Sequence, residues 1–258
     1  MRATTAREIA ALIASAPADE LGRLCERYAD DPRAQVRSAV EAALRRQERE
    51  RAEQERVGAL YERMAELGGD GVVLGIDEVG RGPLAGPLTV CAVWLPPEPR
   101  IEGLNDSKRM SPSRREAVAV RIAEVARAIG ISHVQPESID ALGMAVALRH
   151  AMCQAIVDSG VDPDAVLIDG NPVHVHPRER CVVKGDATVA CIAAASIVAK
   201  VTRDALMVAL DAEYPAYHFA ENKGYGSAEH IAAIREHGLS PAHRASFCSN
   251  FLPEPTLF

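Results

Sequence analysis

The sequence lacks the features that mark disulfide-bonded, membrane-spanning and secreted proteins. Its six cysteines are scattered with no C-x-x-C pair, which fits a reducing cytoplasm better than a disulfide framework or a zinc cluster. The longest largely apolar stretch, Ala187–Ala199, has 13 residues and is too short to span a bilayer. Arg2, Arg7 and Glu8 surround a short apolar run, which is not the pattern of a secretory signal. We therefore expect a cytoplasmic protein that does not cross a membrane.

An excess of positive charge is also missing, but this does not exclude a polyanionic ligand. The formal net charge is −7, with 12 Lys+Arg against 14 Asp+Glu in residues 1–70 and 17 against 22 in residues 71–258. Two divalent cations held by acids of the second segment would bring that segment close to neutrality. Binding of a polyanion would then depend on a local patch and on metal. With 258 residues, the chain can form one sizeable core plus an appendage.

Residues 1–70 have a helical pattern throughout. Thr5–Glu8 is a capping box, and Asp31–Pro32 predicts the start of a helix that runs to the glycine cluster at residues 68–71. Nine of the twelve residues of Arg45–Arg56 are charged and interrupt the apolar stripe of this helix. The segment can stay helical in water through the i, i+4 pairs Arg46/Glu50, Arg49/Glu53 and Arg51/Glu55. The glycines predict a domain boundary between residues 1–70 and 71–258.

The segment 72–87, VVLGIDEVGRGPLAGP, begins as a strand and continues as a polar loop. Its apolar first half predicts a strand that ends in two adjacent carboxylates, Asp77 and Glu78. A divalent cation is the expected partner of such a pair, and a solvated turn is the alternative. Gly80, Arg81 and Gly82 follow, and their bare backbone N–H groups and one cation suit phosphate or ribose. A dinucleotide-binding loop is disfavoured because prolines stand where its helix would start.

From residue 88 onward, strand and helix patterns alternate, which predicts an α/β core. The expected strands are 88–95, 131–134, 166–169 and 181–184, and the expected helices are 113–129, 137–158 and 187–210. The strand 88–95 should run antiparallel to the first strand. The helix 137–158 should bury one face, which consists of Ile139, Leu142, Val146, Met152 and Ile156.

Two further acids stand at the end of a strand and at the start of a helix. Asp169 ends the strand 166–169 and precedes a glycine, which repeats the layout of the first strand and makes a solvated turn less favoured. Asp186 is placed to cap the helix that begins at residue 187, where the helix dipole also stabilises negative charge. His174 and His176 have strand spacing and suggest zinc, but no third ligand is near, so exposed histidines are favoured.

The run GIDEVGRGPLAGP resembles the signature of type 2 ribonucleases H, the ribonuclease HII family, and the likeness covers about residues 72–250. Asp106–Lys108 is similar to a DSK element of that family, and Asn222–His230 and His243–Phe247 match further elements. The resemblance implies a ribonuclease H-like mixed sheet flanked by helices, here preceded by a small all-helical N-terminal region. It also implies two Mg²⁺ or Mn²⁺ ions bound by the catalytic acids Asp77, Glu78, Asp169 and Asp186.

The family resemblance further implies a substrate and a reaction. It implies endonucleolytic cleavage of the RNA strand of RNA/DNA hybrids and incision 5′ to ribonucleotides in duplex DNA, leaving 5′-phosphate and 3′-hydroxyl ends. We expect a monomer that requires no protein partner. The expected substrate-binding residues are Gly80, Arg81, Gly82, Lys108, Lys184, Ser196, Lys200 and Tyr225. Ser196, Lys200 and Arg203 lie at i, i+4 and i+7 and predict a phosphate-contacting helix face, whereas Tyr225, between two glycines, should be exposed beside the neighbouring deoxyribose.

Two other functions stay open from the residues alone. One is a two-metal nuclease of the same fold that acts on a DNA structure, and the other is a non-catalytic nucleic-acid-binding module with a structural cation. The four acids favour an enzyme, because binding alone gains nothing from them. The charged helix of residues 1–70 is either a solvated helix or an arm that adds grip on duplex. In the second case, deletion of residues 1–68 weakens substrate binding.

Overall fold

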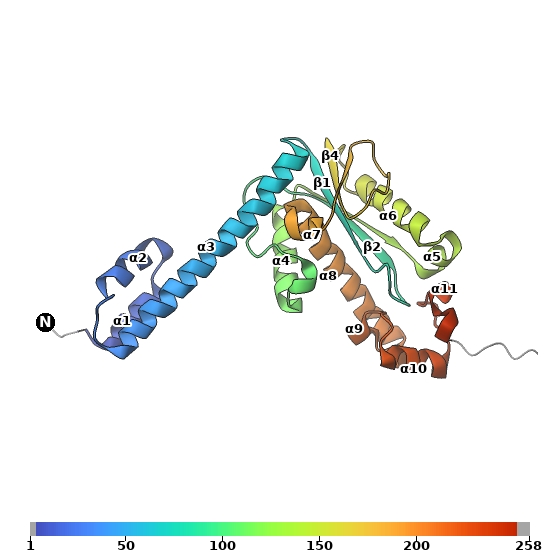
Figure 1. The fold of residues 1–258 in the computed structure, drawn as a ribbon. Coiled ribbons are helices and arrows are strands. Elements are labelled where there is room, and N and C mark those ends of the chain that lie inside the picture. Colours follow the sequence, from blue (N-terminus) through green and yellow to red (C-terminus); the bar gives the residue numbers. More distant parts are fainter. Residues whose placement is uncertain (1–3, 252–258) are drawn as a thin grey trace, which may run out of the picture. The chain divides into compact units, whose positions relative to one another are not determined.

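The computed structural model describes residues 4–251. Contacts divide the chain into two compact units, an N-terminal unit (Met1–Arg56) and a C-terminal unit (Val57–Phe258). Figure 1 shows the course of the chain through both units. None of the helices within residues 4–251 has the length and apolar character needed to cross a membrane.

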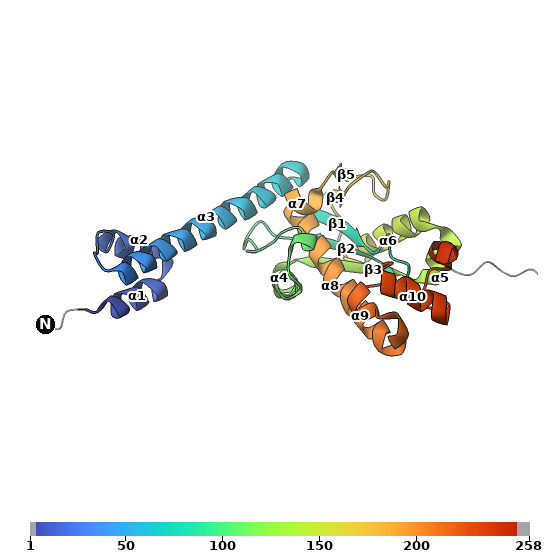
Figure 2. The same cartoon turned by 60° about the horizontal axis from the view of Figure 1, so that its bottom comes forward.

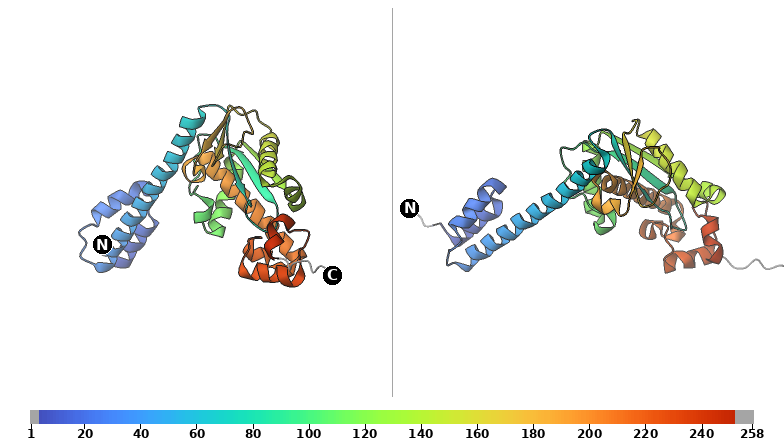
Figure 3. Two further views of the ribbon diagram at one scale, coloured as in Figure 1. Left: turned by 45° about the vertical axis from the view of Figure 1, so that its right-hand side comes forward. Right: turned by 45° about the horizontal axis from the view of Figure 1, so that its top comes forward.

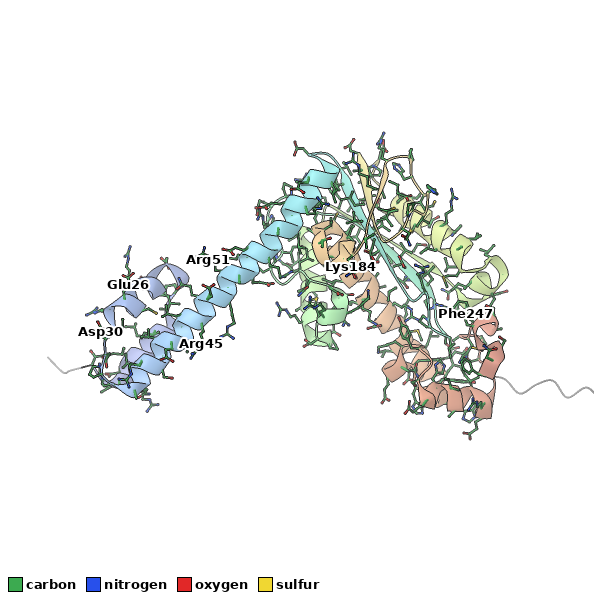
Figure 4. All side chains as sticks on the ribbon, in the orientation of Figure 1. Glu26, Asp30, Arg45, Arg51, Lys184 and Phe247 are labelled. Carbon is green, nitrogen blue, oxygen red and sulfur yellow. The ribbon has the colours of Figure 1, made fainter. Side chains whose placement is uncertain are left out.

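The N-terminal unit is built from α1 (Ala6–Ser15), α2 (Ala18–Arg27) and the first part of α3 (Ala34–Gly68). The predicted capping box is present, because Thr5 and Glu8 each bind the backbone N–H of the other. Apolar residues from all three helices form a small core that consists of Ile9, Ile13, Leu21, Cys25, Val36, Val40 and Ala43. The helical prediction for this region is therefore confirmed. Charged side chains cover its outside, among them those labelled Glu26, Asp30, Arg45 and Arg51 in Figure 4.

Helix α3 begins at Ala34 and not at the predicted Pro32. The carboxylate of Asp31 accepts the Arg33 N–H at 2.9 Å and binds the Arg33 guanidinium at 2.6 Å. These bonds hold residues 31–33 in a turn. The first carbonyl that accepts helical hydrogen bonds is therefore that of Arg33. Two of the predicted charge pairs are present farther along α3: Arg46–Glu50 at 3.8 Å and Arg51–Glu55 at 2.9 Å.

The last turns of α3 belong to the core of the C-terminal unit. Val57, Leu60, Tyr61 and Met64 are buried in the same cluster as residues of the sheet. For this reason the two units divide between Arg56 and Val57, inside α3, whereas the predicted boundary was the glycine cluster that follows the helix.

The C-terminal unit is organised around a five-stranded sheet with the order β3-β2-β1-β4-β5. The strands are β1 (Val73–Val79), β2 (Leu88–Trp94), β3 (Ala128–Val134), β4 (Ala165–Asp169) and β5 (Glu179–Val182). β2 is antiparallel to β1 and to β3, and β4 is parallel to β1 and to β5. The predicted mixed sheet and the antiparallel first pair of strands are confirmed.

Helices cover both faces of the sheet, as Figures 2 and 3 show. Helices α8 (Ala190–Glu213) and α4 (Pro112–Val125) pack with the end of α3 in the cluster on one face. Helices α5 (Pro136–Leu142) and α6 (Met144–Asp158) cover the other face. The pleat of β1 explains this division, because Leu74 and Ile76 point to the α6 side while Val73 points to the α8 side.

Short elements connect the strands and complete the C-terminal part. They are η1 (Ser107–Arg109), α7 (Gly185–Thr188), η2 (Pro215–Tyr217), α9 (Phe219–Asn222), α10 (Ala228–His237), α11 (Ala245–Cys248) and η3 (Ser249–Phe251). The elements after α8 form their own core around Tyr217, Phe219 and Ile234. The end of α8 contributes Met207 to this core, which joins it to the sheet domain.

The predicted helix 137–158 is two helices, because Gly143 has φ +79° and breaks it between α5 and α6. The break changes the direction of the residues that follow. Ile139 and Met152 are buried as predicted, but Leu142 and Val146 are 49% and 54% exposed. The predicted burial of these two residues is therefore wrong.

Gly75 in the middle of β1 determines how closely α8 approaches the sheet. A Cβ atom on Gly75 would lie 2.2 Å from the carbonyl carbon of Cys191 and 2.4 Å from the nitrogen of Ile192. These are backbone atoms at the start of α8, so they can move only if the whole helix end moves.

We expect Gly75→Ala to destabilise the protein by about 1–3 kcal/mol, because it overpacks the contact between β1 and α8. Activity should fall as well, since α7 and α8 carry side chains of the site described below. Urea unfolding measures the first effect. Gly22→Ala is the matched control, because no atom lies within 4 Å of its added Cβ. Equal stability of the Gly75→Ala protein and the wild type would contradict the close approach.

Candidate active site

Three aspartates from separate elements form one cluster, here called the acidic triad. Asp77 lies in β1, Asp169 ends β4 and Asp186 lies in α7, and one carboxylate oxygen of each lies within 4.8 Å of the others. The parallel pairing of β1 with β4 causes this, because Ile76 is opposite Ile168 and the next residue on each strand is the aspartate. Neighbours in register point to the same face of a sheet.

Asp186 reaches the triad from a position that differs from the predicted one. It was expected to cap a helix starting at residue 187, but it lies in the first turn of α7, and Lys184 is the N-cap with φ +57°. An extended residue, Val189, then separates α7 from α8. The cap prediction is wrong because Asp186 lies inside the tight turn of α7. The first N–H group of this turn, that of Gly185, donates to Asp169 Oδ1 at 2.7 Å.

Burial and mutual repulsion make the ionised triad unfavourable without a cation. Asp77 is only 5% exposed, and burial together with the charges of Glu78 and Asp169 raises its pKa well above the ordinary value. Burial and the charge of Asp186 also raise the pKa of Asp169. A divalent cation would relieve this repulsion. A donor set made only of carboxylate oxygens suits hard ions such as Mg²⁺ or Mn²⁺.

Glu78 lies next to the triad and is not a member of it. β1 continues to Val79, so consecutive side chains alternate and Glu78 points to the opposite face from Asp77. Its carboxylate binds the Arg81 guanidinium at 3.3 Å. Glu78 and Asp169 share the wall of a cavity of about 500 Å³, which is also lined by Arg81 and Arg149. The structure thus brings three of the four predicted acids together.

The loop Asp106–Lys108 contacts the triad from outside the sheet. Asp106 caps η1, because its carboxylate accepts the backbone N–H of Lys108 at 2.9 Å. The Lys108 ammonium group lies 3.3 Å from Asp186 Oδ2. Lys108 therefore lies at the edge of the acidic triad with its side chain largely exposed.

Ser196 supports Asp77 from the buried side. Its hydroxyl is a hydrogen-bond partner of the Asp77 carboxylate and lies 2.9 Å from the Ser107 hydroxyl. Since Ser196 is only 4% exposed, it does not have the solvent-facing position that a phosphate contact needs. Its position explains why a hydroxyl is present in the apolar first turns of α8.

The predicted phosphate-contacting face of α8 is wrong for Arg203. Arg203 is fully buried, and its guanidinium donates to the carbonyls of Ala85, Pro87 and Lys223 at 2.9–3.0 Å. Lys200, one turn earlier, is partly exposed and binds Asp204 at 2.8 Å. The i, i+4, i+7 spacing correctly groups these side chains, but it cannot distinguish a solvent-facing side from a side covered by a loop.

The loop 80–87 is held by a second buried arginine, Arg244. Its guanidinium donates to the carbonyls of Gly80, Arg81, Pro83 and Gly86 at 2.7–3.2 Å. Our sequence analysis did not assign this role. A buried arginine that binds only backbone carbonyls needs no acidic partner, so no charge pattern in the sequence indicates it.

The loop exposes Arg81 and Gly82 to solvent, whereas Gly80 is buried. Gly80 has φ +92°, and a Cβ there would lie 2.3 Å from Arg203 Nε, so only glycine fits. No atom lies within 4 Å of the corresponding position on Gly82, and the Arg81 side chain is 59% exposed. Backbone groups and one cation are thus available beside the triad.

Tyr225 lies in a loop that is bound to Leu84 and Ala85 of the loop 80–87. The Gly224 carbonyl accepts the N–H groups of Leu84 and Ala85 at 2.8 and 3.2 Å. Tyr225 is 44% exposed, as predicted, and its ring lies 5.9 Å from the Arg203 guanidinium. Lys184, labelled in Figure 4, is also exposed.

The histidines of the loop after β4 do not form a metal site in the part of the chain described. His174 is exposed, and the only group of three or more suitably placed ligands found within residues 4–251 is the acidic triad. The Glu179 carboxylate organises this loop by accepting the backbone N–H groups of Val173, His174 and Val175. His174 is thus exposed as favoured, whereas His176 is half-buried and its Nδ1 accepts the Arg178 N–H at 3.2 Å.

Known proteins resemble the chain in both parts. The family model described as Ribonuclease HII matches residues 74–250, and the model described as Ribonuclease HII N-terminal domain matches residues 5–64. A Ribonuclease HII from Geobacillus thermodenitrificans is 41% identical over 249 residues, which cover 96% of each chain.

Two solved structures resemble the fold. The ribonuclease H2 of Pyrococcus horikoshii has a TM-score of 0.59 at 24% identity and covers 69% of this chain and 96% of its own. Bst-RNase HIII in complex with Mn²⁺ has a TM-score of 0.52 at 20% identity and covers 70% of this chain and 66% of its own.

Proposed function

Because the chain belongs to the ribonuclease HII family and is a ribonuclease H enzyme, we propose that it acts on two related substrates. It cleaves the RNA strand of RNA/DNA hybrids endonucleolytically, and it incises duplex DNA 5′ to embedded ribonucleotides, leaving 5′-phosphate and 3′-hydroxyl ends. The observation that carries this proposal is the acidic triad, whose Asp169 lines the same cavity as Arg81 of the exposed Arg81–Gly82 backbone.

The acidic triad would hold divalent cations, which we propose to be two ions of Mg²⁺ or Mn²⁺. The all-carboxylate donor set and the raised pKa values of Asp77 and Asp169 support this, and the related fold of Bst-RNase HIII has been solved with Mn²⁺. Bound cations supply charge neutralisation and an activated water for phosphodiester hydrolysis. Glu78 is the fourth acid of the proposed site and would act from the other face of β1.

The residues around the triad would select the ribonucleotide. Gly80, Arg81 and Gly82 would read the 2′-hydroxyl, the group that distinguishes ribose from deoxyribose, and the exposed backbone of Arg81 and Gly82 supports this. The cations Arg81, Lys108, Lys184 and Lys200 would contact phosphates. Arg81 and Lys108 are bound to Glu78 and Asp186, Lys184 precedes Asp186 by two residues, and Lys200 is bound to Asp204. Ser196 would act on the substrate only through Asp77, because it is buried.

We expect Tyr225→Ala to lose the preference for an RNA-to-DNA junction, by about tenfold, while general affinity changes less. The reason is that an exposed aromatic ring beside the site contributes a contact to one nucleotide and not to the whole duplex. The measurement compares kcat/KM on a duplex with one ribonucleotide and on a continuous RNA/DNA hybrid. Tyr214→Ala controls for the loss of a tyrosine elsewhere, and an unaltered ratio for Tyr225→Ala would contradict the assignment.

We also expect the N-terminal unit to add affinity for the duplex. Deletion of residues 1–56 leaves Val57–Met64 in the core of the C-terminal unit, whereas deletion of residues 1–68 would remove buried side chains and test folding instead. The shorter deletion should raise KM or Kd several-fold, about 3–10-fold, with kcat nearly unchanged. Equal affinity with and without residues 1–56 would remove the proposed binding role.

One gel tests the proposed reaction against its alternatives. A duplex with one ribonucleotide and an all-DNA duplex of the same sequence are each incubated with and without Mg²⁺ or Mn²⁺. Metal-dependent nicking of the first duplex only, 5′ to the ribonucleotide, is the expected result. Nicking of both would indicate a nuclease for DNA structures, and binding without nicking would indicate a non-catalytic module.

A further inference from the structure

Two buried histidines connect the C-terminal core to the Tyr225 loop. His230 in α10 is fully buried, His243 is 5% exposed, and their Nε2 atoms are 3.0 Å apart. At one end of this pair, His230 Nδ1 lies 2.8 Å from the Tyr225 carbonyl oxygen. At the other end, His243 Nδ1 lies 3.0 Å from the Ser240 backbone nitrogen. These four residues form a continuous chain of hydrogen bonds, here called the histidine relay.

The backbone groups at the two ends determine where the protons lie. The Ser240 N–H can only donate, so His243 Nδ1 must carry a lone pair and, in the neutral ring, Nε2 carries the proton. The Tyr225 carbonyl can only accept, so His230 Nδ1 carries the proton and its Nε2 accepts. Of the two Nε2 atoms that face each other, one is therefore a donor and the other an acceptor, and His243 Nε2–H donates to His230 Nε2.

The relay has this direction only when both rings are neutral. A proton added to either ring would place two N–H donors against each other at one of its contacts. Burial lowers the pKa of both rings, and burial with the neighbouring His230 lowers that of His243 to about 4. Tyr217 packs edge-on against His243 with ring centroids 4.6 Å apart, which helps to keep the pair out of water.

The histidine relay holds the Tyr225 carbonyl, whereas Leu84 and Ala85 hold the Gly224 carbonyl and Asn222 accepts the Tyr225 N–H. Tyr225 stands between Gly224, which has φ +83°, and Gly226, and its ring lies partly in solvent. Glycines make the backbone permissive, so the orientation of the Tyr225 peptide must come from its hydrogen bonds. Its carbonyl accepts two, one from His230 Nδ1 and one from the Ser227 N–H at 2.8 Å.

We propose that His230 and His243 are positioning residues of the ribonuclease site, which hold the Tyr225 ring in place for the substrate through the carbonyl of Tyr225. The same loop is joined through Gly224 to Leu84 and Ala85, which follow the backbone proposed to read the sugar, so the relay also sets the ring relative to the loop 80–87. This role rests on the proposed substrate contact of Tyr225. Neither histidine touches the substrate in this arrangement.

The proton positions can be tested without any substrate. Imidazole ¹⁵N resonances of the full-length protein at neutral pH should show His243 protonated at Nε2 and His230 protonated at Nδ1. His230→Leu and His243→Leu assign the two sets of signals. The opposite tautomer for either ring, or a charged ring at neutral pH, would overturn the relay whatever the enzyme cleaves.

The functional role is tested with two substitutions of His230 that differ in one hydrogen bond. The amide of His230→Asn can still donate to the Tyr225 carbonyl, whereas His230→Leu cannot. We expect kcat/KM for an RNA/DNA hybrid to fall about tenfold in His230→Leu and about twofold in His230→Asn. Melting temperatures of both variants show whether they are folded at the assay temperature.

A double-mutant cycle separates positioning from a general loss of structure. In a Tyr225→Ala background, His230→Leu should change kcat/KM by less than about twofold, because the ring that it positions is absent. The same loss in both backgrounds, or no loss in either, would overturn the proposal. If the wild type fails to incise at a single ribonucleotide, the proposed function fails on that substrate, and the cycle on the hybrid still decides the role of the relay.

Discussion

Asp77→Asn should abolish phosphodiester hydrolysis, by about 10³-fold or more, and yet raise the thermal stability of the metal-free protein. The loss follows from removing a charged ligand at the centre of the acidic triad. The gain follows from removing the most buried charge of a repelling group. Asparagine keeps an oxygen that can accept the Glu78 N–H, as Asp77 Oδ1 does at 2.8 Å. Duplex binding should persist, because the surrounding loops are unchanged.

The stability effect has a defined dependence on pH. The pKa of Asp77 is raised in the folded protein, so at low pH the group is protonated in both states and contributes nothing. As the pH rises above the unfolded value of about 4, only the unfolded chain releases the proton easily, and the metal-free wild type loses stability. The advantage of Asp77→Asn should therefore be present at pH 7 and disappear toward about pH 3.

Melting temperatures in chelator at the two pH values measure this effect, with cleavage assays at neutral pH beside them. Mn²⁺ should raise the melting temperature of the wild type much more than that of Asp77→Asn. Glu116→Gln removes one negative charge from an exposed position and is the matched control. A less stable Asp77→Asn protein at pH 7 would show that Asp77 does not destabilise the metal-free protein by charge repulsion. A substantial rate of cleavage by this variant would show that Asp77 is not an essential metal ligand.

Arg244→Met should destabilise the protein by about 3–5 kcal/mol, because it leaves buried carbonyls without donors. Five hydrogen bonds from Arg244 reach the loop 80–87. Burial lowers the pKa of Arg244 to about 10, so the guanidinium is still charged at neutral pH and all of these donors are available. The substitution also releases the backbone of Gly80 and Arg81. We expect this to misplace the substrate and to lower kcat/KM by about 100-fold.

Urea unfolding and hybrid cleavage measure the two consequences of Arg244→Met. Arg235→Met removes an exposed arginine from α10 and controls for the loss of charge. Arg244→Lys should recover little of the stability, because one ammonium group cannot reach four carbonyls at once. A variant with normal stability and a selective loss of affinity would instead show that Arg244 contacts the nucleic acid directly.

The acids of the site could be predicted from the sequence because each of them departs from a local pattern. Asp77 and Asp169 terminate apolar strands, and Asp186 stands at the start of a small-residue helix. Burying a carboxylate needs a partner, and this requirement can be stated without knowing the fold. Whether a segment is a strand or a helix could also be predicted from the sequence, because hydrophobic periodicity is a property of one segment at a time.

The errors have a common physical origin. Gly143 broke a helix whose apolar residues looked continuous, and Arg203 looked like an exposed cation on α8. For Arg203 the deciding contacts come from residues that are distant in the sequence. For Gly143 the deciding feature is a backbone conformation that composition does not encode. The predicted end of the first strand at its two acids is a related case, because β1 continues to Val79 through its pairing with β2, so Asp77 and Glu78 point to opposite faces.

The residue types and their periods were thus determined by the sequence alone, and the carboxylates without a partner predicted a cation. Tertiary structure alone decided which polar side chains support the site from within. Arg203 reaches the carbonyl of a residue 116 positions away, and Arg244 reaches one 164 positions away. Hydrogen bonds to backbone carbonyls are available on every residue, so the sequence carries no sign of which ones are used until packing brings the elements together.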